Sequence, residues 1–306
     1  MTRARHLDEL AIDPISACAS SHLPTNGFFF TFSTAPAAKR SALAPIRHHA
    51  TESSVNQTEV THFNALASSW WDPHGGSRLL HLMNPLRHDF LHRCLAPEVR
   101  DPHQKLRFLD VGCGGGIFAE SAARLASTES VMAIDPTPEV IAVARKHART
   151  DPRLMEPGRL TYKQVAIEEL QTPRANQYDV VSVFEVIEHI RNPYAFLTSV
   201  LPHLKPGGWL IGSTIARSPV SWLTTKLVAE DLLRIVPRGT HDWSQYLNPQ
   251  EIRDWARREE RLSTSEGLGW HTMGVVYVPG MGWREVKGSE TWGNYFFGVK
   301  KREDAV

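Results

Sequence analysis

The chain has 306 residues, a formal net charge of +1 at pH 7, 42% hydrophobic residues and 22% charged residues. This length suits one sizeable α/β domain with extensions, and the composition is ordinary for a globular protein. A net charge so close to zero provides no global basic field, so we expect no nucleic-acid partner. The 3 cysteines include no C-x-x-C pair, which argues against a disulfide scaffold or a zinc–thiolate site. No apolar run reaches about 18 residues, so we do not expect the chain to span a bilayer.

Residues 1–55 differ in composition from the rest of the chain. The stretch from Pro14 to Thr51 contains no Asp or Glu but carries three basic residues, Lys39, Arg40 and Arg47. Together with frequent Ser, Ala, Thr and Pro, this is typical of a mitochondrial transit segment. Acidic residues before Pro14 interrupt the acid-poor amphipathic helix that such a segment should carry. A disordered tail without a targeting role is therefore the alternative.

From Leu106 onward, short apolar runs alternate with helical patterns, which indicates a parallel sheet covered on both faces. We expect helices at Ile117–Ser127, Pro138–Thr150 and Pro193–Leu204, each lying between two strands. Two later strands, near Ser265–Met273 and Trp292–Lys300, would pair across a long loop rich in glycine and aromatic residues. The prediction is an α/β Rossmann-like fold with a seven-stranded, mostly parallel sheet that ends in an antiparallel pair. The first five strands are expected at Arg107–Val111, Val131–Asp135, Leu160–Ala166, Tyr178–Val186 and Trp209–Thr214.

The segment from Leu109 to Gly116 reads L-D-V-G-C-G-G-G and joins the first strand to the first helix. Glycines let a backbone turn sharply and approach a ligand closely, and free N–H groups at a helix start favour a negative group. The loop resembles motif I of class I methyltransferases, which cradles the amino-acid part of S-adenosylmethionine. A dinucleotide-binding loop would need G-x-G-x-x-G, but Ile117 stands at its third glycine position. A glycine turn without a ligand is the remaining alternative.

Two acidic residues flank this loop in a way that fits the same cofactor. Asp110 precedes the glycines and suits a cofactor ammonium better than a pyrophosphate. Asp135 ends the second strand, 23 residues after Gly112. An acidic side chain at that position can accept hydrogen bonds from both ribose hydroxyls, as in related nucleotide-binding folds.

Four further segments narrow the resemblance. With the glycine loop, they resemble the ubiquinone-biosynthesis O-methyltransferases that act on polyprenylated catechols, over about Phe63 to Lys301. The W-W-D and G-T-H-D motifs within them are more specific to that family than the glycine loop, which many methyltransferases share. The segments are F-N-A-L-A-S-S-W-W-D at 63–72, L-H-L-M-N-P-L-R at 80–87, F-E-V-I-E-H at 184–189 and V-P-R-G-T-H-D-W at 236–243.

The resemblance implies roles for particular residues. The arginine of N-P-x-R, here Arg87, would meet the cofactor carboxylate, a task that suits a bidentate guanidinium. Phe184 would line the cofactor pocket. The glycine and ribose positions correspond to Gly112 and Asp135, so the complete cofactor-binding prediction is Arg87, Asp110, Gly112, Gly114, Asp135 and Phe184.

The implied substrates are 3,4-dihydroxy-5-polyprenylbenzoate and demethylubiquinol, each methylated on a ring hydroxyl next to another oxygen. The sulfonium is already activated, so the enzyme must align it with the oxygen and remove the proton of the oxygen. Other readings are a methyltransferase for another small phenol or for RNA, and a non-catalytic subunit of a lipid-biosynthetic complex. The neutral charge disfavours RNA, and the intact cofactor residues disfavour a silent subunit.

Glu185, Glu188 and His189 follow the fourth strand, at the edge where open α/β sheets bind ligands. Two carboxylates and an imidazole are suitable ligands for Mg²⁺, Mn²⁺ or Zn²⁺, and the family is associated with a divalent cation. Bound to both catechol oxygens, such an ion would favour the phenolate. We expect a metal site here, with Mg²⁺ as the first choice. The alternatives are His189 as general base and a purely structural role.

The segment Val220–Val236 is apolar around most of its circumference apart from one charged stripe. Such a helix must be buried, cover the active site or lie in a membrane interface. The predicted organisation is a transit or disordered segment at 1–55, a helical extension at 56–105, and a methyltransferase domain at 106–306 with an apolar insertion at about 217–247. A polyprenyl substrate implies a peripheral protein on the matrix side of the inner mitochondrial membrane, in a multi-enzyme ubiquinone-biosynthesis complex.

Overall fold

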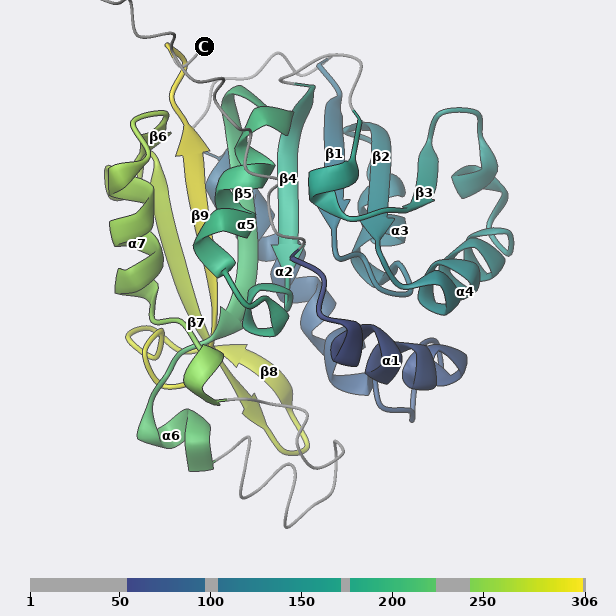
Figure 1. Ribbon diagram of the computed structural model, residues 1–306, viewed down its shortest axis with the longest axis horizontal. Coiled ribbons are helices and arrows are strands. Elements are labelled where there is room, and N and C mark those ends of the chain that lie inside the picture. The colour runs from purple at the N-terminus through teal and green to yellow at the C-terminus, as the bar shows by residue number, and fades with distance from the viewer. Residues whose placement is uncertain (1–53, 97–103, 172–176, 224–242, 305–306) are drawn as a thin grey trace, which may run out of the picture. The chain divides into compact units, whose positions relative to one another are not determined.

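A computed structural model of the protein describes residues 54–96, 104–171, 177–223 and 243–304. The strands follow the order β3-β2-β1-β4-β5-β9-β7-β8 in the sheet, and β6 pairs with β9 (Figure 1). The first five strands are parallel, whereas β9 runs antiparallel to β5 and to β7. The strands are β1 (Leu106–Val111), β2 (Thr128–Asp135), β3 (Leu160–Gln164), β4 (Tyr178–Phe184), β5 (Leu204–Ile215), β6 (Leu262–Ser263), β7 (Trp270–Val278), β8 (Gly282–Glu285) and β9 (Asn294–Lys301).

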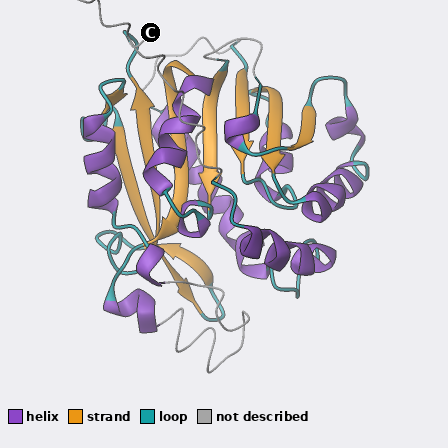
Figure 2. Cartoon of the chain, viewed as in Figure 1, coloured by secondary structure: helices purple, strands orange, loops and turns teal. Residues whose placement is uncertain are grey.

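Helices cover both faces of this sheet (Figure 2). Helices α2, α3 and α4 contribute to one hydrophobic core, and α5 and α7 contribute to the other. A short helix, α6, precedes the segment 224–242, which lies outside the described residues. The helices are α1 (Gln57–Leu66), α2 (Arg78–Leu95), α3 (Ile117–Ala123), α4 (Pro138–Ala148), α5 (Pro193–Val200), α6 (Pro219–Trp222) and α7 (Pro249–Arg258).

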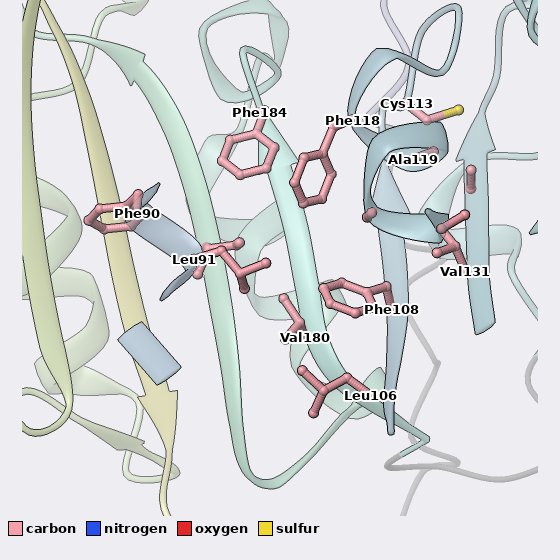
Figure 3. Packing of buried hydrophobic residues seen from close by; sticks show 14 of the residues in the cluster. Phe90, Leu91, Leu106, Phe108, Cys113, Phe118, Ala119, Val131, Val180 and Phe184 are labelled. Carbon is pink, nitrogen blue, oxygen red and sulfur yellow. The ribbon is translucent and has the colours of Figure 1, made fainter. Parts of the chain in front are cut away.

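The two cores follow from the alternation of side chains along the strands. In β1, Phe108 faces the core of α2, α3 and α4, while Leu109 faces the core of α5 and α7. Val180 and Val181 divide in the same way in β4, whose seven residues are all buried. A continuous apolar run of this kind is what a parallel strand covered on both faces requires. Figure 3 shows Phe108 and Val180 in the first core.

The α/β prediction is confirmed, but the sheet has more strands than the seven expected. The described residues form nine strands, because β6 and β8 add to the predicted set. Strand β8 lies in the stretch for which the sequence predicts a loop. Its Trp283 lies opposite Tyr277 of β7, with ring centroids 5.5 Å apart, and Gly280 and Gly282 form the turn with φ of 79° and 76°. Aromatic pairing across the hairpin stabilises this strand, although the glycines nearby favour a loop in a prediction from sequence.

The strand order places a ligand crevice at a definite point. Strand β1 pairs with β2 on one side and with β4 on the other, so the chain reverses its direction of winding between β1 and β4. Open α/β sheets bind ligands beyond the carboxyl ends of strands at such a switch point. Asp135 ends β2 and Phe184 ends β4 there, while Val111 of β1 leads into the glycine loop.

The predicted organisation at 1–55, 56–105 and 106–306 stays a prediction. Residues 1–53 lie outside the described residues, and so does most of Val220–Val236. Residues 56–105 contain α1 and α2, and α1 begins with the Asn56 side chain accepting the N–H of Thr58 at 3.1 Å. Among the described helices, none has the length and apolar character needed to cross a membrane.

Candidate active site

A cavity of about 240 Å³ lies at the switch point. Its walls come from α1, α2, the glycine loop and the ends of β2 and β4. Every site residue predicted from the sequence lines it: Arg87, Asp110, Gly112, Gly114, Asp135, Phe184, Glu185, Glu188 and His189.

The glycine loop could not be built from other residues. Gly112 and Gly114 have φ of 69° and 54°, in the left-handed region that side chains disfavour. A Cβ atom on Gly112 would lie 2.5 Å from Cγ2 of Val186, and one on Gly114 would overlap the indole of Trp70. The loop therefore presents bare backbone to the cavity, with Trp70 packed against it.

Asp135 connects this loop to the end of β2. Its Oδ2 accepts the N–H of Gly114 at 3.0 Å, and its Oδ1 accepts the N–H of Thr137 at 2.9 Å. Burial raises the pKa of Asp135, and these N–H groups act in the opposite direction. Each oxygen keeps a lone pair, so the carboxylate can also accept hydroxyl groups of a ligand.

The cavity wall also contains charged groups with unused hydrogen-bonding atoms. Arg87 is only 4% exposed, its Nε has no hydrogen-bond partner, and its guanidinium lies 5.0 Å from the Phe184 ring centroid. Asp110 accepts the Ser182 hydroxyl at 2.6 Å through Oδ1, but Oδ2 has no partner. Buried Oε1 of Glu185 also lacks one. Because buried charges are normally paired, these atoms point to a ligand that carries both a cation and an anion.

Burial sets the ionisation of these groups. It lowers the pKa of Arg87, while the charges of Glu185, Asp110 and Glu188 act against that effect. Burial raises the pKa of Asp110 to about 7, although the hydrogen bond from Ser182 and the charge of Arg87 lower it. Asp110 is therefore close to half-ionised at neutral pH, and a ligand cation would favour its charged form.

Glu185, Glu188 and His189 occupy the turn after β4, which includes the 3₁₀ helix Ile187–His189. Glu185 has φ of 55°, the single positive value for a non-glycine among the described residues. Such backbone strain is common at functional sites. Glu188 Oε2 accepts the Thr214 hydroxyl at 2.9 Å, and burial together with the charge of Glu185 raises the pKa of Glu188 to about 7.

His189 makes a contact that the sequence did not predict. Its Nδ1 lies 2.9 Å from Oε2 of Glu59 in α1, and its ring packs edge-on against Phe63 with centroids 5.2 Å apart. Burial lowers the pKa of His189, but the hydrogen bond with Glu59 and the charge of Glu188 outweigh it, so the net shift is upward. With Nδ1 held by Glu59, Nε2 is the nitrogen that a ligand can use.

This contact bears on the predicted metal site. Glu188 is bound to Thr214, and His189 is bound to Glu59. In the part of the chain that the structure describes, no group of three or more His, Cys, Asp or Glu side chains is placed to hold a metal ion. The three predicted ligands share one cavity wall but do not converge in this arrangement, so the metal site stays a prediction.

The sequence did not reveal the parts of the site that come from α1 and the segment after it. Glu59 has no local pattern that marks it, because its partner lies 130 residues away. Trp70 and Trp71 belong to the W-W-D motif, which indicated the family but not the function of either ring. The Trp71 indole donates to the Gly115 carbonyl at 2.9 Å and stacks on His147 with centroids 3.4 Å apart. Both tryptophans, which belong to the segment after α1, thus contact the glycine loop.

Comparisons with known proteins agree with this geometry. A family model described as a methyltransferase domain matches residues 78–259. A mitochondrial ubiquinone biosynthesis O-methyltransferase of Candida albicans is 38% identical over 286 residues, which cover 81% of this chain and 86% of that protein. The protein of the same name from Schizosaccharomyces pombe is 42% identical over 226 residues, covering 74% and 77%. A bacterial ubiquinone biosynthesis O-methyltransferase, from Alkalilimnicola ehrlichii, is 38% identical over 74% of this chain and 87% of its own length.

The chain belongs to the ubiquinone biosynthesis O-methyltransferase family. Solved structures show the same fold at low sequence identity. Magnesium protoporphyrin IX methyltransferase from Synechocystis, with bound S-adenosylhomocysteine, has a TM-score of 0.56 at 14% identity and covers 80% of this chain and 100% of its own. A plantazolicin methyltransferase with the same ligand has a TM-score of 0.53 at 17% identity, covering 80% and 99%. Family and fold together confirm the predicted S-adenosylmethionine-dependent O-methyltransferase.

Proposed function

We propose that this protein transfers the methyl group of S-adenosylmethionine to a ring hydroxyl of polyprenylated catechols in ubiquinone biosynthesis. The substrates would be 3,4-dihydroxy-5-polyprenylbenzoate and demethylubiquinol. The names of its relatives support the pathway. The observation that carries the proposal is one cavity that joins a site for a zwitterion, at Arg87 and Asp110, to a buried acid–imidazole cluster at Glu188 and His189.

The cofactor assignment follows from the unpaired charges. Arg87 would bind the carboxylate of S-adenosylmethionine, and Asp110 would bind its ammonium, so that the atoms now without partners are satisfied. The backbone at Gly112 and Gly114 would lie against the amino-acid portion. Asp135 would accept the ribose hydroxyls through its remaining lone pairs. Together these contacts would hold the cofactor in the cavity that Glu188 and His189 also line.

Removal of the acceptor proton is assigned to His189. A phenolic hydroxyl has a pKa of about 10 and is mostly neutral at pH 7, so transfer needs a base. Glu59 holds Nδ1 of His189 and thereby fixes the ring, as a carboxylate does in other histidine-based catalytic sites. Nε2 would take the proton of the hydroxyl. S-adenosylmethionine would supply the methyl group and leave as S-adenosylhomocysteine. The anionic forms of Glu185 and Glu188 would stabilise the resulting imidazolium.

A divalent cation is a separate proposal. Glu185 and Glu188 would hold it, with His189 as a third ligand through Nε2 while Nδ1 stays on Glu59. Mg²⁺, Mn²⁺ or Zn²⁺ would supply charge that favours the phenolate. The arrangement described does not fit a three-ligand metal, since no such group is assembled among the described residues. The steps assigned above therefore use side chains alone.

Purified protein with labelled S-adenosylmethionine and a short-chain prenyl catechol tests the proposed function. We expect a labelled ether on one ring oxygen, and no product from the matching dimethoxy ring, which has no free hydroxyl. Exhaustive chelation followed by Mg²⁺, Mn²⁺ or Zn²⁺ decides the metal proposal in the same assay. No label in any prenyl catechol, with S-adenosylhomocysteine still binding, would contradict the substrate assignment.

The location of the protein is proposed on two grounds. Two of the relatives described above carry "mitochondrial" in their names, and residues 1–55 have the composition of a transit segment. A peripheral position on the matrix side of the inner membrane, within a ubiquinone-biosynthesis complex, would give access to a polyprenyl substrate. The described chain adjoining 224–242 carries exposed apolar side chains that would contribute, namely Trp222 and Leu223, which are 49% and 45% exposed. Fluorescent protein fused to residues 1–55 should enter mitochondria, and diffuse cytosolic fluorescence would contradict the targeting role.

A further inference from the structure

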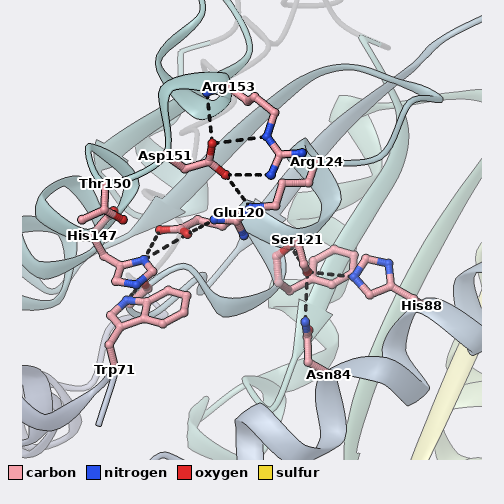
Figure 4. A network of polar contacts seen from close by, with 12 residues as sticks. Trp71, Asn84, His88, Glu120, Ser121, Arg124, His147, Thr150, Asp151 and Arg153 are labelled. Carbon is pink, nitrogen blue, oxygen red and sulfur yellow. Dashed lines mark hydrogen bonds and ion pairs between the residues drawn. The ribbon is translucent and has the colours of Figure 1, made fainter. Parts of the chain in front are cut away.

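The asparagine of the N-P-x-R segment has no place in the site described so far. Asn84 does not line the cavity that Arg87 lines. Instead its Nδ2 donates to the hydroxyl of Ser121 in α3 at 3.0 Å. His88, the residue after Arg87, places Nε2 at 2.7 Å from the same hydroxyl (Figure 4). Ser121 is thus contacted from both sides of Arg87 along α2.

The hydroxyl of Ser121 uses its full hydrogen-bonding capacity in this arrangement. A serine hydroxyl has one proton and two lone pairs. The proton goes to the Phe118 carbonyl at 2.9 Å, so both lone pairs accept, one from Asn84 and one from His88 Nε2–H. Burial lowers the pKa of His88 to about 4, so its imidazole is neutral at physiological pH. A neutral imidazole carries one proton, which in this arrangement is on Nε2.

The three partners connect the elements that form the cofactor site. Asn84 and His88 are four residues apart and therefore lie on one face of α2, with Arg87 in the turn between them. Ser121 lies in α3, which directly follows the glycine loop. The same helix carries Phe118, which packs edge-on against Phe184 with centroids 4.7 Å apart. Phe184 is also the ring beneath the Arg87 guanidinium.

The Arg87 side chain has few contacts that would fix its position. Its Nε has no hydrogen-bond partner, and its guanidinium forms no ion pair among the described contacts. A long side chain without hydrogen bonds of its own is placed by its backbone, by packing and, here, by the nearby charges of Asp110 and Glu185. We propose that Asn84, His88 and Ser121 form a clamp that sets Arg87 against the glycine loop, so that they act as positioning residues for the cofactor carboxylate. The clamp rests on the proposed role of Arg87.

Comparing two ligands separates positioning from general stability. S-adenosylhomocysteine has the carboxylate that Arg87 would bind, whereas 5′-methylthioadenosine lacks the amino-acid group. By calorimetry, Ser121→Ala should lower the affinity for S-adenosylhomocysteine about tenfold, or about 1.4 kcal/mol. The affinity for 5′-methylthioadenosine should change by less than about twofold. Ser121→Thr keeps the hydroxyl and should behave as wild type. In an Arg87→Ala background, Ser121→Ala should have no further effect, because the coupled partner is gone.

Ser199→Ala is the matched control, since Ser199 is also half-buried in a helix and donates to the carbonyl three residues earlier, Phe196, at 2.7 Å. If Ser121→Ala fails to fold, Asn84→Ala is measured in the same way, since it leaves the hydroxyl in place. Equal weakening of both ligands, or no weakening of either, overturns the clamp. If Arg87→Ala weakens S-adenosylhomocysteine but the clamp variants do not, only the clamp is wrong. If Arg87→Ala leaves the affinity unchanged, the proposed role of Arg87 fails and the clamp fails with it.

Discussion

At the scale of single residues, the contact between Glu59 and His189 controls when the proposed base is available. The base must be neutral, and the pKa of His189 is raised above its ordinary value of about 6.5. Turnover should therefore rise with pH through that raised pKa. Glu59→Gln removes the charge that raises it, so the rise should move to lower pH, while maximal turnover falls about 10- to 100-fold because the ring loses its orienting partner.

The pH–rate profile of Glu59→Gln, with the affinity for S-adenosylhomocysteine measured beside it, checks this prediction. Glu285→Gln serves as the control. Glu285, at the end of β8, forms an ion pair with Arg93 at 2.8 Å and does not line the cavity. An unshifted profile would show that Glu59 does not set the ionisation of the base.

The raised pKa of Asp110 leads to a prediction about how cofactor affinity depends on pH. Burial raises its pKa to about 7, so below pH 7 it is mostly protonated before the cofactor binds. A cofactor ammonium favours the carboxylate, so affinity for S-adenosylhomocysteine should increase as pH rises from about 6 to about 8, by up to about tenfold per pH unit. Calorimetry in two buffers of different protonation enthalpy should detect proton release at pH 6.5. Asp110→Asn should remove most of both effects, and their full persistence in that variant would assign them to another group.

The difference between predicted and unpredicted residues has a physical cause. Arg87, Asp110, Asp135 and Phe184 lie at fixed positions relative to strand ends or motifs, and parallel strands bring those ends to one edge. Sequence spacing therefore identified them as candidates. Glu59 approaches His189 only through tertiary packing of α1, which no local pattern encodes.

At the scale of elements, the segment that follows α1 restrains the glycine loop through Trp71. The indole donates to the Gly115 carbonyl, and its ring stacks on His147, whose Nδ1 lies 2.9 Å from Glu120. Trp71→Phe keeps an aromatic ring but removes the hydrogen bond. We expect affinity for S-adenosylhomocysteine to fall by about 0.5–1.5 kcal/mol, the usual net value of one hydrogen bond.

Trp283→Phe is the matched control for this substitution. The Trp283 indole also donates to a backbone carbonyl, that of Leu79, at 3.0 Å. Trp283 lies on β8 and does not line the cavity. Calorimetry on both variants makes the comparison. An equal loss of affinity in the two variants, or no loss with Trp71→Phe, would contradict a specific restraint on the loop.

The elements themselves were predictable to different degrees. The five parallel strands were identifiable because each is a short apolar run covered on both faces, as in β4. Strand β8 was not identifiable, because it is short and lies in a stretch rich in glycine and tryptophan. It forms by pairing with β7. Boundaries also shifted: β7 spans Trp270–Val278 rather than ending near Met273, since hairpin pairing extends it.

At the scale of the whole molecule, the proposed membrane contact makes a testable claim about one surface. Trp222 and Trp292 are 49% and 50% exposed, and the Ser218 hydroxyl beside α6 donates to the Trp292 carbonyl. Changing Trp222 and Leu223 to Asp should reduce sedimentation with anionic liposomes about tenfold, because the apolar area available for burial is lost. Binding of S-adenosylhomocysteine should change little.

The control pair for this surface is Leu268→Asp with Met281→Asp, since those side chains are 70% and 60% exposed at other places in the chain. They should leave sedimentation unchanged. If the Trp222 and Leu223 variant loses thermal stability together with cofactor binding, these residues belong to the folded core of the protein rather than to a membrane surface.

The central claim is that one cavity has two functional ends, one that holds the cofactor and one that acts on the acceptor oxygen. His189→Ala tests it most directly, with turnover of a short-chain prenyl catechol and affinity for S-adenosylhomocysteine measured on the same preparation. Turnover should fall by about 10²-fold or more, the scale of general acid–base assistance, while cofactor affinity stays within about twofold. Unchanged turnover, or a parallel loss of cofactor affinity, would contradict this division.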